Sequence, residues 1–495
     1  CIRDSKRMLD LGTYYWTYGS LDKAEKTFER VHSYEKEINT GIVGDVLYKK
    51  SRIFEQNGKK TLALKTMDQA LSKVLSRSRK EELVWRRFFL AYEMAFEKVK
   101  GRDKKLQTAF SLLKKKLSRS QVREQKFLFW RGRINSLIDQ DKKARKYFKD
   151  AYAKNKYSYY GILSGLALRE DGIKVEQWKL EKSEGYAQPD WDAFMDRNQY
   201  VNNSRYKDLV RAYSLARIGQ FKEVQKIYPK LDKSIWRVLG RRKIAQKTRR
   251  KFAHAMAWFR DALADPMGGL KASEASRIYF PDQMGGLEHR YLYPLAHWEL
   301  IDRHADMRDI DPWVVVSLIR QESAFNPMAK SHANALGLMQ MIPPVAKKEA
   351  RLLQMDGFRP EDTFQPYVAV KLGVHHLARL FRQFDGSFIC SFASYNAGSG
   401  PVKKWLDYYS TDFPLVFVER ISYSETRNYV KKIIRNFVLY NRIYKDADVK
   451  VASLFKMPGG IGLSRLLSYE NSRRISSESV SYKHLTLPTI GCVVV

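Results

Sequence analysis

A pattern of small and large residues recurs four times in the first half of the chain and limits its fold more than any other feature. Each copy has a turn residue, a small or β-branched residue five positions later, and an aromatic residue or Met four positions beyond that. The copies are Gly19, Ala24 and Phe28; Gly58, Ala63 and Met67; Asp139, Ala144 and Phe148; and Gly219, Val224 and Tyr228. Their first residues lie 39, 81 and 80 positions apart, close to one or two steps of a helix-pair repeat.

This spacing has a physical reason. Each helical hairpin needs a small residue where its helices cross closely and a large residue to fill the next groove, and stacked hairpins bury a continuous core. Strand patterns are almost absent from the chain. We therefore predict a mainly all-α protein in which residues 1–265 form a helical-hairpin solenoid, or superhelix. Residues 266–289, which are rich in Gly and carry Pro, are predicted to form a linker.

Glu322 lies at the end of a predicted helix that covers residues 311–322. Asp311 is suited to the N-cap and Pro312 to the first helical position, which is how helices commonly start. Residues 326–327, Asn-Pro, are expected to end the helix because a residue before proline avoids the helical region.

The spacing of apolar residues in this helix gives Glu322 a chemical interpretation. Val315, Leu318 and Ile319 share a face with it, so the carboxylate is expected on the apolar stripe. Desolvation and the negative end of the helix dipole would both raise its pKa, and a carboxyl group protonated near neutral pH can act as a general acid. A glutamate near a helix end is usually a solvated surface residue, so the spacing alone does not decide between the two interpretations.

Two further segments carry polar groups suited to holding a sugar. Residues 337–340, Gly-Leu-Met-Gln, are typical of a turn that enters a short apolar stretch with one polar side chain, Gln340. Residues 394–398, Ser-Tyr-Asn-Ala-Gly, are typical of a helix that ends at glycine. Taken alone, the Tyr-Asn pair is most often a helix C-cap with a packed aromatic ring.

Together and in this order, these segments resemble the soluble lytic murein transglycosylases, whose catalytic domain is related to goose-type lysozyme. The matching elements are Glu322-Ser323, residues 337–340, residues 394–398, Ser-Glu-Thr-Arg with Tyr-Val at 424–430, and a lead-in at Tyr293-Pro294. The resemblance covers residues 290–446 and implies a lysozyme-like, α-rich catalytic domain there. It also implies a helical superhelix before that domain, in agreement with the repeats.

The resemblance implies a peptidoglycan lytic transglycosylase, which cleaves the MurNAc-GlcNAc β-1,4 bond without water and leaves 1,6-anhydroMurNAc ends. Most glycosidases use two carboxylates, but this chain offers one in an obvious catalytic position. In the family the glutamate protonates the leaving oxygen, the N-acetyl group of the sugar assists, and the glutamate then takes the proton of the C6 hydroxyl. Glu322 is therefore expected to act as acid and then as base.

The same resemblance assigns substrate binding to seven residues: Ser323, Ser331, Gln340, Tyr395, Asn396, Glu425 and Tyr429. Tyr395 is expected near the acetamido group of the sugar, and Ser331 near a substrate peptide or acetamide. Glu425 is the only candidate for a second carboxylate, but pairing with Arg427 or a lysine on a helix is an equally good interpretation.

Two residues depart from the family pattern. Asn334 stands in the turn before residues 337–340, where relatives are richer in Gly, and Asn is the next-best residue after Gly for a left-handed backbone. Ser394 replaces an Ala beside the site tyrosine and adds a hydroxyl group. We expect the loop and the pocket to keep their shapes.

The chain is strongly basic, with 90 Lys and Arg against 54 Asp and Glu and a formal charge of +36. Such a charge attracts polyanions, so nucleic acid is one alternative partner. However, no compact nucleic-acid recognition motif is present, and much of the charge lies on helical segments such as Lys114-Lys115-Lys116. We expect a solvated basic face, no specific nucleic acid, and peptidoglycan glycan strands, which are themselves anionic, as the substrate.

The sequence gives no reason to expect a cofactor or a metal. Cys1, Cys390 and Cys492 show neither a disulfide nor a metal-binding spacing, and His375 and His376 are adjacent, so they are not expected to face one metal ion from a helix. No segment approaches the length of a transmembrane helix. The substrate class implies the periplasm, with peripheral contacts to the membrane or to cell-wall complexes as an additional expectation.

Both ends of the chain suggest an incomplete or altered sequence. It begins at Cys1 without Met and enters a helical repeat at once, so we expect a fragment without its signal peptide; a lipid-modified Cys1 is the less favoured alternative. Residues 447–495 are interpreted as an unreliable tail. The part from about residue 481 to residue 490 resembles a translated sequencing adaptor rather than protein.

Three other functions fit parts of these observations. A hydrolytic goose-type lysozyme would use the same fold, but such enzymes are usually small and lack a long superhelix. A non-catalytic peptidoglycan-binding scaffold is disfavoured by the presence of Glu322. A nucleic-acid-binding solenoid is the remotest alternative. Exolytic and endolytic action both fit the sequence.

Overall fold

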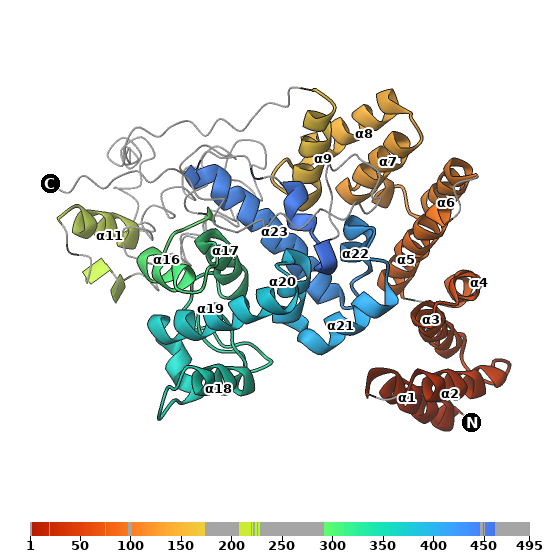
Figure 1. The fold of residues 1–495 in the computed structure, drawn as a ribbon, viewed down its shortest axis with the longest axis horizontal. Coiled ribbons are helices and arrows are strands. Elements are labelled where there is room, and N and C mark those ends of the chain that lie inside the picture. Colours follow the sequence, from red (N-terminus) through yellow and green to blue (C-terminus); the bar gives the residue numbers. More distant parts are fainter. Residues whose placement is uncertain are drawn as a thin grey trace. The chain divides into compact units, whose positions relative to one another are not determined.

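The computed structural model describes residues 2–18, 20–74, 76–97, 101–173, 207–218, 220, 223–224, 226–227, 292–445, 449 and 451–460. Contacts between residues divide the chain into two compact units. The first unit consists of Cys1–Val175, Leu380–Arg435 and Lys450–Ser479, and the second of Glu176–Arg379, Asn436–Val449 and Val480–Val495. Figure 1 gives the order of the helices along the chain.

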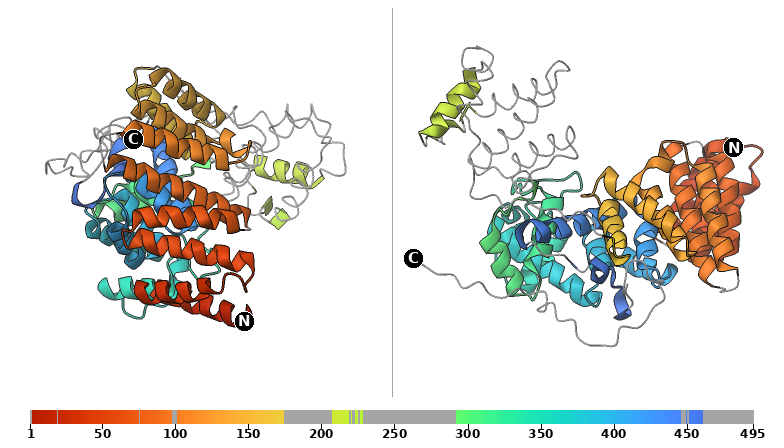
Figure 2. Two further views of the ribbon diagram at one scale, coloured as in Figure 1. Left: turned by 90° about the vertical axis from the view of Figure 1, so that its right-hand side faces the viewer. Right: turned by 90° about the horizontal axis from the view of Figure 1, so that it is seen from above.

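The first unit begins with a row of helical hairpins (Figure 2). Its helices are α1 (Ile2–Tyr18), α2 (Leu21–Ser33), α3 (Thr40–Gln56), α4 (Lys60–Lys73), α5 (Arg77–Phe96), α6 (Arg102–Lys116), α7 (Gln125–Leu137), α8 (Asp141–Lys154) and α9 (Tyr159–Glu170), with a short 3-10 helix η1 (Gln121–Arg123) before α7. α1 packs on α2, α3 on α4, α5 on α6 and α7 on α8, and the second helix of each pair also contacts the next pair. This arrangement confirms the predicted helical-hairpin solenoid.

Glycine residues in the first helix of two hairpins receive the recurring aromatic ring of the second. A Cβ atom added to Gly12 in α1 would lie 2.5 Å from the Phe28 ring in α2. A Cβ atom added to Gly132 in α7 would lie 2.6 Å from the Phe148 ring in α8. Both phenylalanines are buried, and the glycine-to-ring spacing is the same in the two hairpins. The rings therefore occupy space that would be filled by a Cβ atom if either residue were not glycine.

The remaining copies of the repeat are described in part. Ala63 and Met67 are fully buried in α4, as the pattern predicts. In the fourth copy Val224 is buried, while Gly219 and Tyr228 lie outside the described residues.

The first unit also contains helices from the C-terminal half of the chain. These are α20 (Phe388–Ala397), α21 (Ser399–Tyr408), α22 (Pro414–Arg420), the first part of α23 (Ser424–Lys445), and the 3-10 helices η4 (Val451–Phe455) and η5 (Pro458–Gly460). α22 packs directly on α5 of the solenoid. Within this unit, segments that are far apart in sequence therefore share one core.

A buried cluster of charges links α22 to the solenoid. The carboxylate of Glu55 in α3 is inaccessible to solvent and lies 2.5 Å from the guanidinium of Arg420 in α22. Arg52 and Arg86 each approach the other carboxylate oxygen to 3.3 Å, and Arg420 also pairs with the buried Glu93 of α5. Burial alone would raise the pKa of Glu55, but Arg420, Arg86 and Arg52 outweigh it and hold the pKa below its ordinary value.

A second buried cluster links α22 and α23 to later solenoid helices. Glu419 accepts a hydrogen bond from Tyr160 of α9 at 2.6 Å and lies 3.0 Å from Lys126 of α7 and 2.8 Å from Lys431 of α23. Burial opposes ionisation of Glu419, but the two lysines hold its pKa far below the ordinary value. The beginning of α23 is thus attached to the solenoid by charge as well as by packing.

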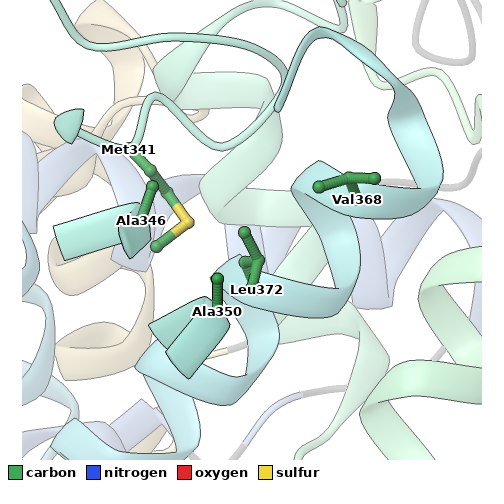
Figure 3. Packing of buried hydrophobic residues seen from close by; sticks show 5 residues of the cluster. All are labelled: Met341, Ala346, Ala350, Val368 and Leu372. Carbon is green, nitrogen blue, oxygen red and sulfur yellow. The ribbon is translucent and has the colours of Figure 1, made fainter. Parts of the chain in front are cut away.

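The second unit contains α11 (Lys207–Arg217), α16 (Trp298–Asp306), α17 (Pro312–Glu322), α18 (Pro343–Leu352), the 3-10 helix η3 (Pro360–Phe364), most of α19 (Pro366–Gln383) and the end of α23. One hydrophobic cluster joins α18 to α19 (Figure 3). It is formed by Met341, Ala346, Ala350, Val368 and Leu372.

The segment that precedes α16 is fixed by α17 and the end of α23. Arg320 of α17 donates to the carbonyl of Leu292 at 2.6 Å and lies over the Tyr293 ring at 4.3 Å. Tyr440 and Tyr444 of α23 donate to the carbonyls of Pro294 and Tyr293 at 2.9 and 2.6 Å. These hydrogen bonds satisfy buried carbonyl groups of a non-helical segment and account for the lead-in at Tyr293-Pro294.

The all-α prediction is confirmed, because the described residues form helices and two isolated β-bridges but no strand. The predicted tail, residues 447–495, stays a prediction, but part of it is packed against the rest of the first unit. Leu454, Phe455 and Met457 lie in the region predicted as an unreliable tail, yet they are buried, and Ser387 donates to the carbonyl of Lys456 at 2.7 Å. Their apolar side chains pack into the core of the first unit. The sequence of this short segment alone does not predict that packing.

The predicted boundaries at residues 265, 289 and 446 stay predictions. The linker, residues 266–289, and the last part of the tail, residues 461–495, lie outside the described residues.

The buried Glu55 carboxylate gives a direct test of the first unit. We expect Glu55→Gln to lower the free energy of unfolding by about 3 kcal/mol, because three arginines lose a buried carboxylate that they share. Chemical denaturation followed by circular dichroism measures this change. Glu29→Gln, whose side chain is 54% exposed, is the matched control and should change stability by less than about 0.5 kcal/mol. Equal effects of the two substitutions would contradict the importance of this cluster.

Candidate active site

Glu322 is the last residue of α17, as predicted. The Asp311 side chain accepts a hydrogen bond from the backbone N–H of Trp313 at 2.8 Å, and Pro312 occupies the first turn. The predicted N-cap residue and the predicted proline in the first turn of α17 are therefore both confirmed. The helix ends at Glu322 with Ser323 as its C-cap, several residues before the Asn326-Pro327 pair that was expected to end it.

The apolar face of α17 does not single out Glu322 as expected. All residues from Trp313 to Arg320 are buried, whatever face of α17 they occupy. The helix is thus surrounded by protein, and a shared face with Val315, Leu318 and Ile319 does not distinguish Glu322. Its partial burial follows instead from its place at the end of the helix, where protein cover decreases. The raised pKa of Glu322 stays a prediction.

The backbone directly after Glu322 is strained. Ala324 and Phe325 have φ angles of +50° and +64°, a left-handed conformation that costs a residue with a side chain about 1–2 kcal/mol. Phe325 is nevertheless buried, so packing of its ring holds the turn in place. Consecutive strained residues of this kind concentrate at functional sites, where the surrounding structure over-determines them.

The Gly337-to-Gln340 segment is held by close backbone contacts. Gly337 has a φ angle of +75°, and a Cβ atom there would lie 2.0 Å from the carbonyl oxygen of Thr363. Met339 is buried against Gly373 of α19, where an added Cβ atom would lie 2.3 Å from its sulfur. Two glycines therefore determine where this segment runs, and the second was not indicated by the sequence pattern.

Gln340 supports the loop that follows Glu322. Its Nε2 group donates to the carbonyls of Ala329 and Gly337 at 3.0 and 2.9 Å, so both amide hydrogens are used within the protein. The side-chain oxygen is the atom through which Gln340 can bind a ligand, and it can only accept hydrogen bonds.

Ser331 and Asn334 shape the same loop. The Ser331 hydroxyl accepts a hydrogen bond from the backbone N–H of Ala335 at 3.0 Å. Asn334 has a φ angle of +62°, which confirms that asparagine adopts the left-handed conformation expected of this turn.

Helix α20 carries the Tyr-Asn pair at its end. Ser387 caps its N-terminus, and Gly398, with a φ angle of +83°, ends it directly after Ala397, as predicted. Tyr395 and Asn396 are half-buried. The Oδ1 atom of Asn396 accepts a hydrogen bond from the Thr426 hydroxyl at 2.6 Å, and Thr426 lies in the first turn of α23.

Glu425 and Tyr429 lie beside Thr426 at the start of α23. Glu425 is exposed and Tyr429 is buried. Arg427, the expected partner of Glu425, donates instead to the carbonyl of Ile421 at 2.7 Å. The interpretation of Glu425 as a structural ion pair with Arg427 is therefore not supported.

The two units divide the predicted site residues equally. The second unit brings Glu322, Ser323, Ser331 and Gln340 onto α17 and its following loop. The first unit brings Tyr395, Asn396, Glu425 and Tyr429 onto the end of α20 and the start of α23. The contact of Thr426 with Asn396 was not predicted from the sequence. The only local signal was its place in the 424–430 motif.

A separate cluster surrounds the buried Glu349 of α18. His375 and His376 both direct Nδ1 at its carboxylate, at 2.7 and 3.0 Å, and Arg379 approaches to 2.5 Å. Burial alone would raise the pKa of Glu349, but these neighbours lower it. Adjacent histidines can therefore face one group from a helix, contrary to our premise.

No group of three or more His, Cys, Asp or Glu side chains suited to a metal ion occurs among the described residues. Cys390 is buried and unpaired with another cysteine; Cys1 and Cys492 lie outside the described residues. Within the part of the chain that the structure describes, none of the helices is both long and apolar enough to cross a bilayer.

One known domain family matches the part of the chain that contains Glu322, Gln340 and Asn396. Residues 299–412 match the Transglycosylase SLT domain. The match includes Glu322, Gln340 and Asn396. The resemblance stated from the sequence motifs is thus confirmed.

Individual relatives agree with this assignment. The chain is 35% identical over 162 residues to the soluble lytic murein transglycosylase of Escherichia coli, a match that covers 32% of this chain and 25% of the relative. It is 38% identical over 161 residues to a protein described as a putative soluble lytic murein transglycosylase of Haemophilus influenzae, covering 32% and 27%. The matched part thus spans about a quarter of the length of these relatives.

The fold resembles solved structures over a larger part of the chain. The 70 kDa soluble lytic transglycosylase of Escherichia coli has a TM-score of 0.63 at 18% identity, covering 93% of this chain and 64% of the other. An inactive mutant of the lytic transglycosylase Slt of Pseudomonas aeruginosa has a TM-score of 0.55 at 19% identity, covering 91% and 72%. At these identities the likeness supports the fold alone.

The contact at Gly337 gives a test of the loop geometry. We expect Gly337→Ala to lower the free energy of unfolding by about 2 kcal/mol more than Gly357→Ala, because its Cβ atom would collide with a carbonyl group. Gly357 also has a positive φ, +68°, but open space around it, so the control carries the conformational cost without the collision. Thermal and chemical denaturation measure both changes, and equal losses would contradict the close approach to Thr363.

The Ser394 hydroxyl gives a test of α20. It is buried and has no hydrogen-bond partner among the described residues. Because an unsatisfied buried hydroxyl is costly and Ala favours helix, we expect Ser394→Ala to stabilise the protein by about 1 kcal/mol. Denaturation measurements would show this, with the exposed Ser424→Ala near the start of α23 as the control. A loss of stability would show that the hydroxyl has a partner.

Proposed function

We propose that this protein is a peptidoglycan lytic transglycosylase that cleaves the MurNAc-GlcNAc β-1,4 bond and leaves 1,6-anhydroMurNAc ends. The Transglycosylase SLT domain match over residues 299–412 carries this proposal. Relatives named as soluble lytic murein transglycosylases support it. So does the strained turn directly after Glu322, because such strain is maintained where function requires it.

In this proposal Glu322 is the general acid and then the general base. It protonates the glycosidic oxygen as the bond breaks, and the N-acetyl group of the same sugar assists at the anomeric carbon. Glu322 then removes the proton of the C6 hydroxyl, whose oxygen closes the anhydro ring. The relay returns Glu322 to its protonated form without consuming water.

Two other buried or half-buried carboxylates of the second unit, Glu349 and Asp311, are less suited to this role. Glu349 is committed to two histidines and Arg379, and Asp311 caps α17. A proton relay needs a carboxylate that substrate can reach. Glu322, half-buried at the end of its helix, meets this requirement.

The substrate-binding residues of the proposal are Ser323, Ser331, Gln340, Tyr395, Asn396, Glu425 and Tyr429. Gln340 would accept a hydrogen bond from a sugar N–H or hydroxyl group, since its own donors are used. In this proposal the protein acts in the periplasm, on glycan strands. One related enzyme was solved in complex with bulgecin A.

The decisive experiment is digestion of purified sacculi, with mass spectrometry of the released muropeptides. We expect anhydro products, which are lighter by one water than the products of hydrolysis. Glu322→Gln should reduce their release at least about a hundredfold, because general acid and base catalysis contributes that much, while leaving the circular dichroism spectrum unchanged.

Glu361→Gln is the matched control, because it makes the same chemical change at an exposed position of the second unit. It should retain full activity. Hydrated reducing ends would favour a hydrolytic lysozyme, and binding of sacculi without release of any product would favour a scaffold. Activity retained in Glu322→Gln would remove Glu322 from the mechanism.

A further inference from the structure

The hydrogen bond between α20 and α23 joins a proposed substrate-binding residue to one with no assigned role. Asn396 lies at the penultimate position of α20 and is half-buried. Thr426 is 1% exposed and cannot contact substrate directly. Its hydroxyl lies 2.6 Å from Oδ1 of Asn396, so any influence on substrate would pass through the Asn396 side chain.

The length of this contact indicates which end of the Asn396 amide faces Thr426. Hydrogen bonds of the O–H···O kind are about 2.5–3.0 Å long, whereas N–H···O bonds are about 2.7–3.2 Å. A separation of 2.6 Å therefore fits an amide oxygen facing the hydroxyl, with the threonine as donor. The opposite orientation, with Nδ2 facing Thr426, would make an unusually short contact.

Threonine is well suited to hold the amide in this orientation. Its β-branched side chain is largely limited to two χ1 rotamers in a helix, and α23 begins only two residues earlier, at Ser424. The helix start is itself fixed, because Lys431 pairs with the buried Glu419. The hydroxyl therefore has a defined position relative to the end of α20.

We propose that Thr426 is a positioning residue that fixes the Asn396 amide with its Nδ2 hydrogens directed at the substrate. Asn396 then acts as a hydrogen-bond donor, and its ligand is an acceptor oxygen of the glycan, of the hydroxyl or acetamido-carbonyl class. This inference rests on the proposed function. Without the threonine hydroxyl, the Asn396 amide rotates between two orientations. In one of them its oxygen faces the acceptor oxygen of the glycan, and no hydrogen bond can form.

The test compares Thr426→Val, which removes the hydroxyl and keeps the branched shape, with Thr426→Ser, which keeps the hydroxyl. On soluble glycan strands we expect Thr426→Val to raise KM about tenfold, the effect of one lost hydrogen bond, with a smaller change in kcat. Thr426→Ser should restore most of the loss. Thr411→Val is the control, since it makes the same change elsewhere in the first unit and should leave kinetics unchanged.

A double-mutant cycle separates positioning from a structural role. If Thr426 acts through Asn396, then Thr426→Val has no further effect on KM in an Asn396→Ala background. Additive effects in the cycle would overturn the proposal. So would an unchanged KM in Thr426→Val with the parent enzyme active, or a loss in Thr426→Ser equal to that in Thr426→Val.

Crystal structures of the parent and of Thr426→Val give a second readout that does not depend on activity. The Asn396 amide should be ordered in the parent and turned or disordered in the variant. An amide that keeps one orientation in Thr426→Val would overturn the proposal. A parent that releases no product from sacculi would contradict the proposed function, while the crystal comparison still decides whether Thr426 holds Asn396.

Discussion

The first unit depends on a negative charge that has no access to water. Glu55 is ionised in the interior because Arg420, Arg52 and Arg86 surround it, and removing its carboxylate would leave buried positive charge without its main counter-charge. Arg420 and Glu55 lie on helices that are 365 residues apart in sequence. The solenoid helices α3 and α5 and the helix α22 can therefore separate only at a large electrostatic cost.

This constraint extends to the residues proposed to bind substrate. Glu419, next to Arg420 in α22, binds Lys126 and Tyr160 of the solenoid and Lys431 of α23. Burial lowers the pKa of Lys431 to about 7, against the opposing effect of Glu419. The solenoid thus fixes the start of α23, and this helix presents Thr426 and Tyr429. Within the first unit the solenoid therefore also holds residues of the proposed site in place.

Local sequence patterns predicted the features that depend on neighbouring residues. The cap at Asp311, the end of α20 at Gly398 and the left-handed Asn334 follow from short-range backbone preferences, and the repeated Gly, Ala and aromatic residues follow from helix crossing. The charge clusters around Glu55 and Glu419 could not be predicted in this way. Arginine and lysine are so frequent in this chain that no local pattern distinguishes a buried Arg420 from a solvated one.

The same limit applied within the site. Glu322 was predicted as the catalytic residue from motif order, while its helical face does not single it out because Trp313 to Arg320 are all buried. Contacts of Gly337 with Thr363 and of Met339 with Gly373 join segments whose proximity no periodicity encodes. The residue types indicated which side chains are candidates for catalysis or binding. Long-range packing determines the position of each of them.

The side-chain amides of Gln340 and Asn396 have opposite hydrogen-bonding character because the protein holds them through opposite ends. Both donors of Gln340 are used on backbone carbonyls, so its oxygen accepts, whereas the oxygen of Asn396 is used by Thr426, so its nitrogen donates. Free amides offer both functions and can rotate to suit many ligands. In each residue one end of the amide is held by the protein, so the amide cannot rotate before a ligand binds. This restriction lowers the entropic cost of binding.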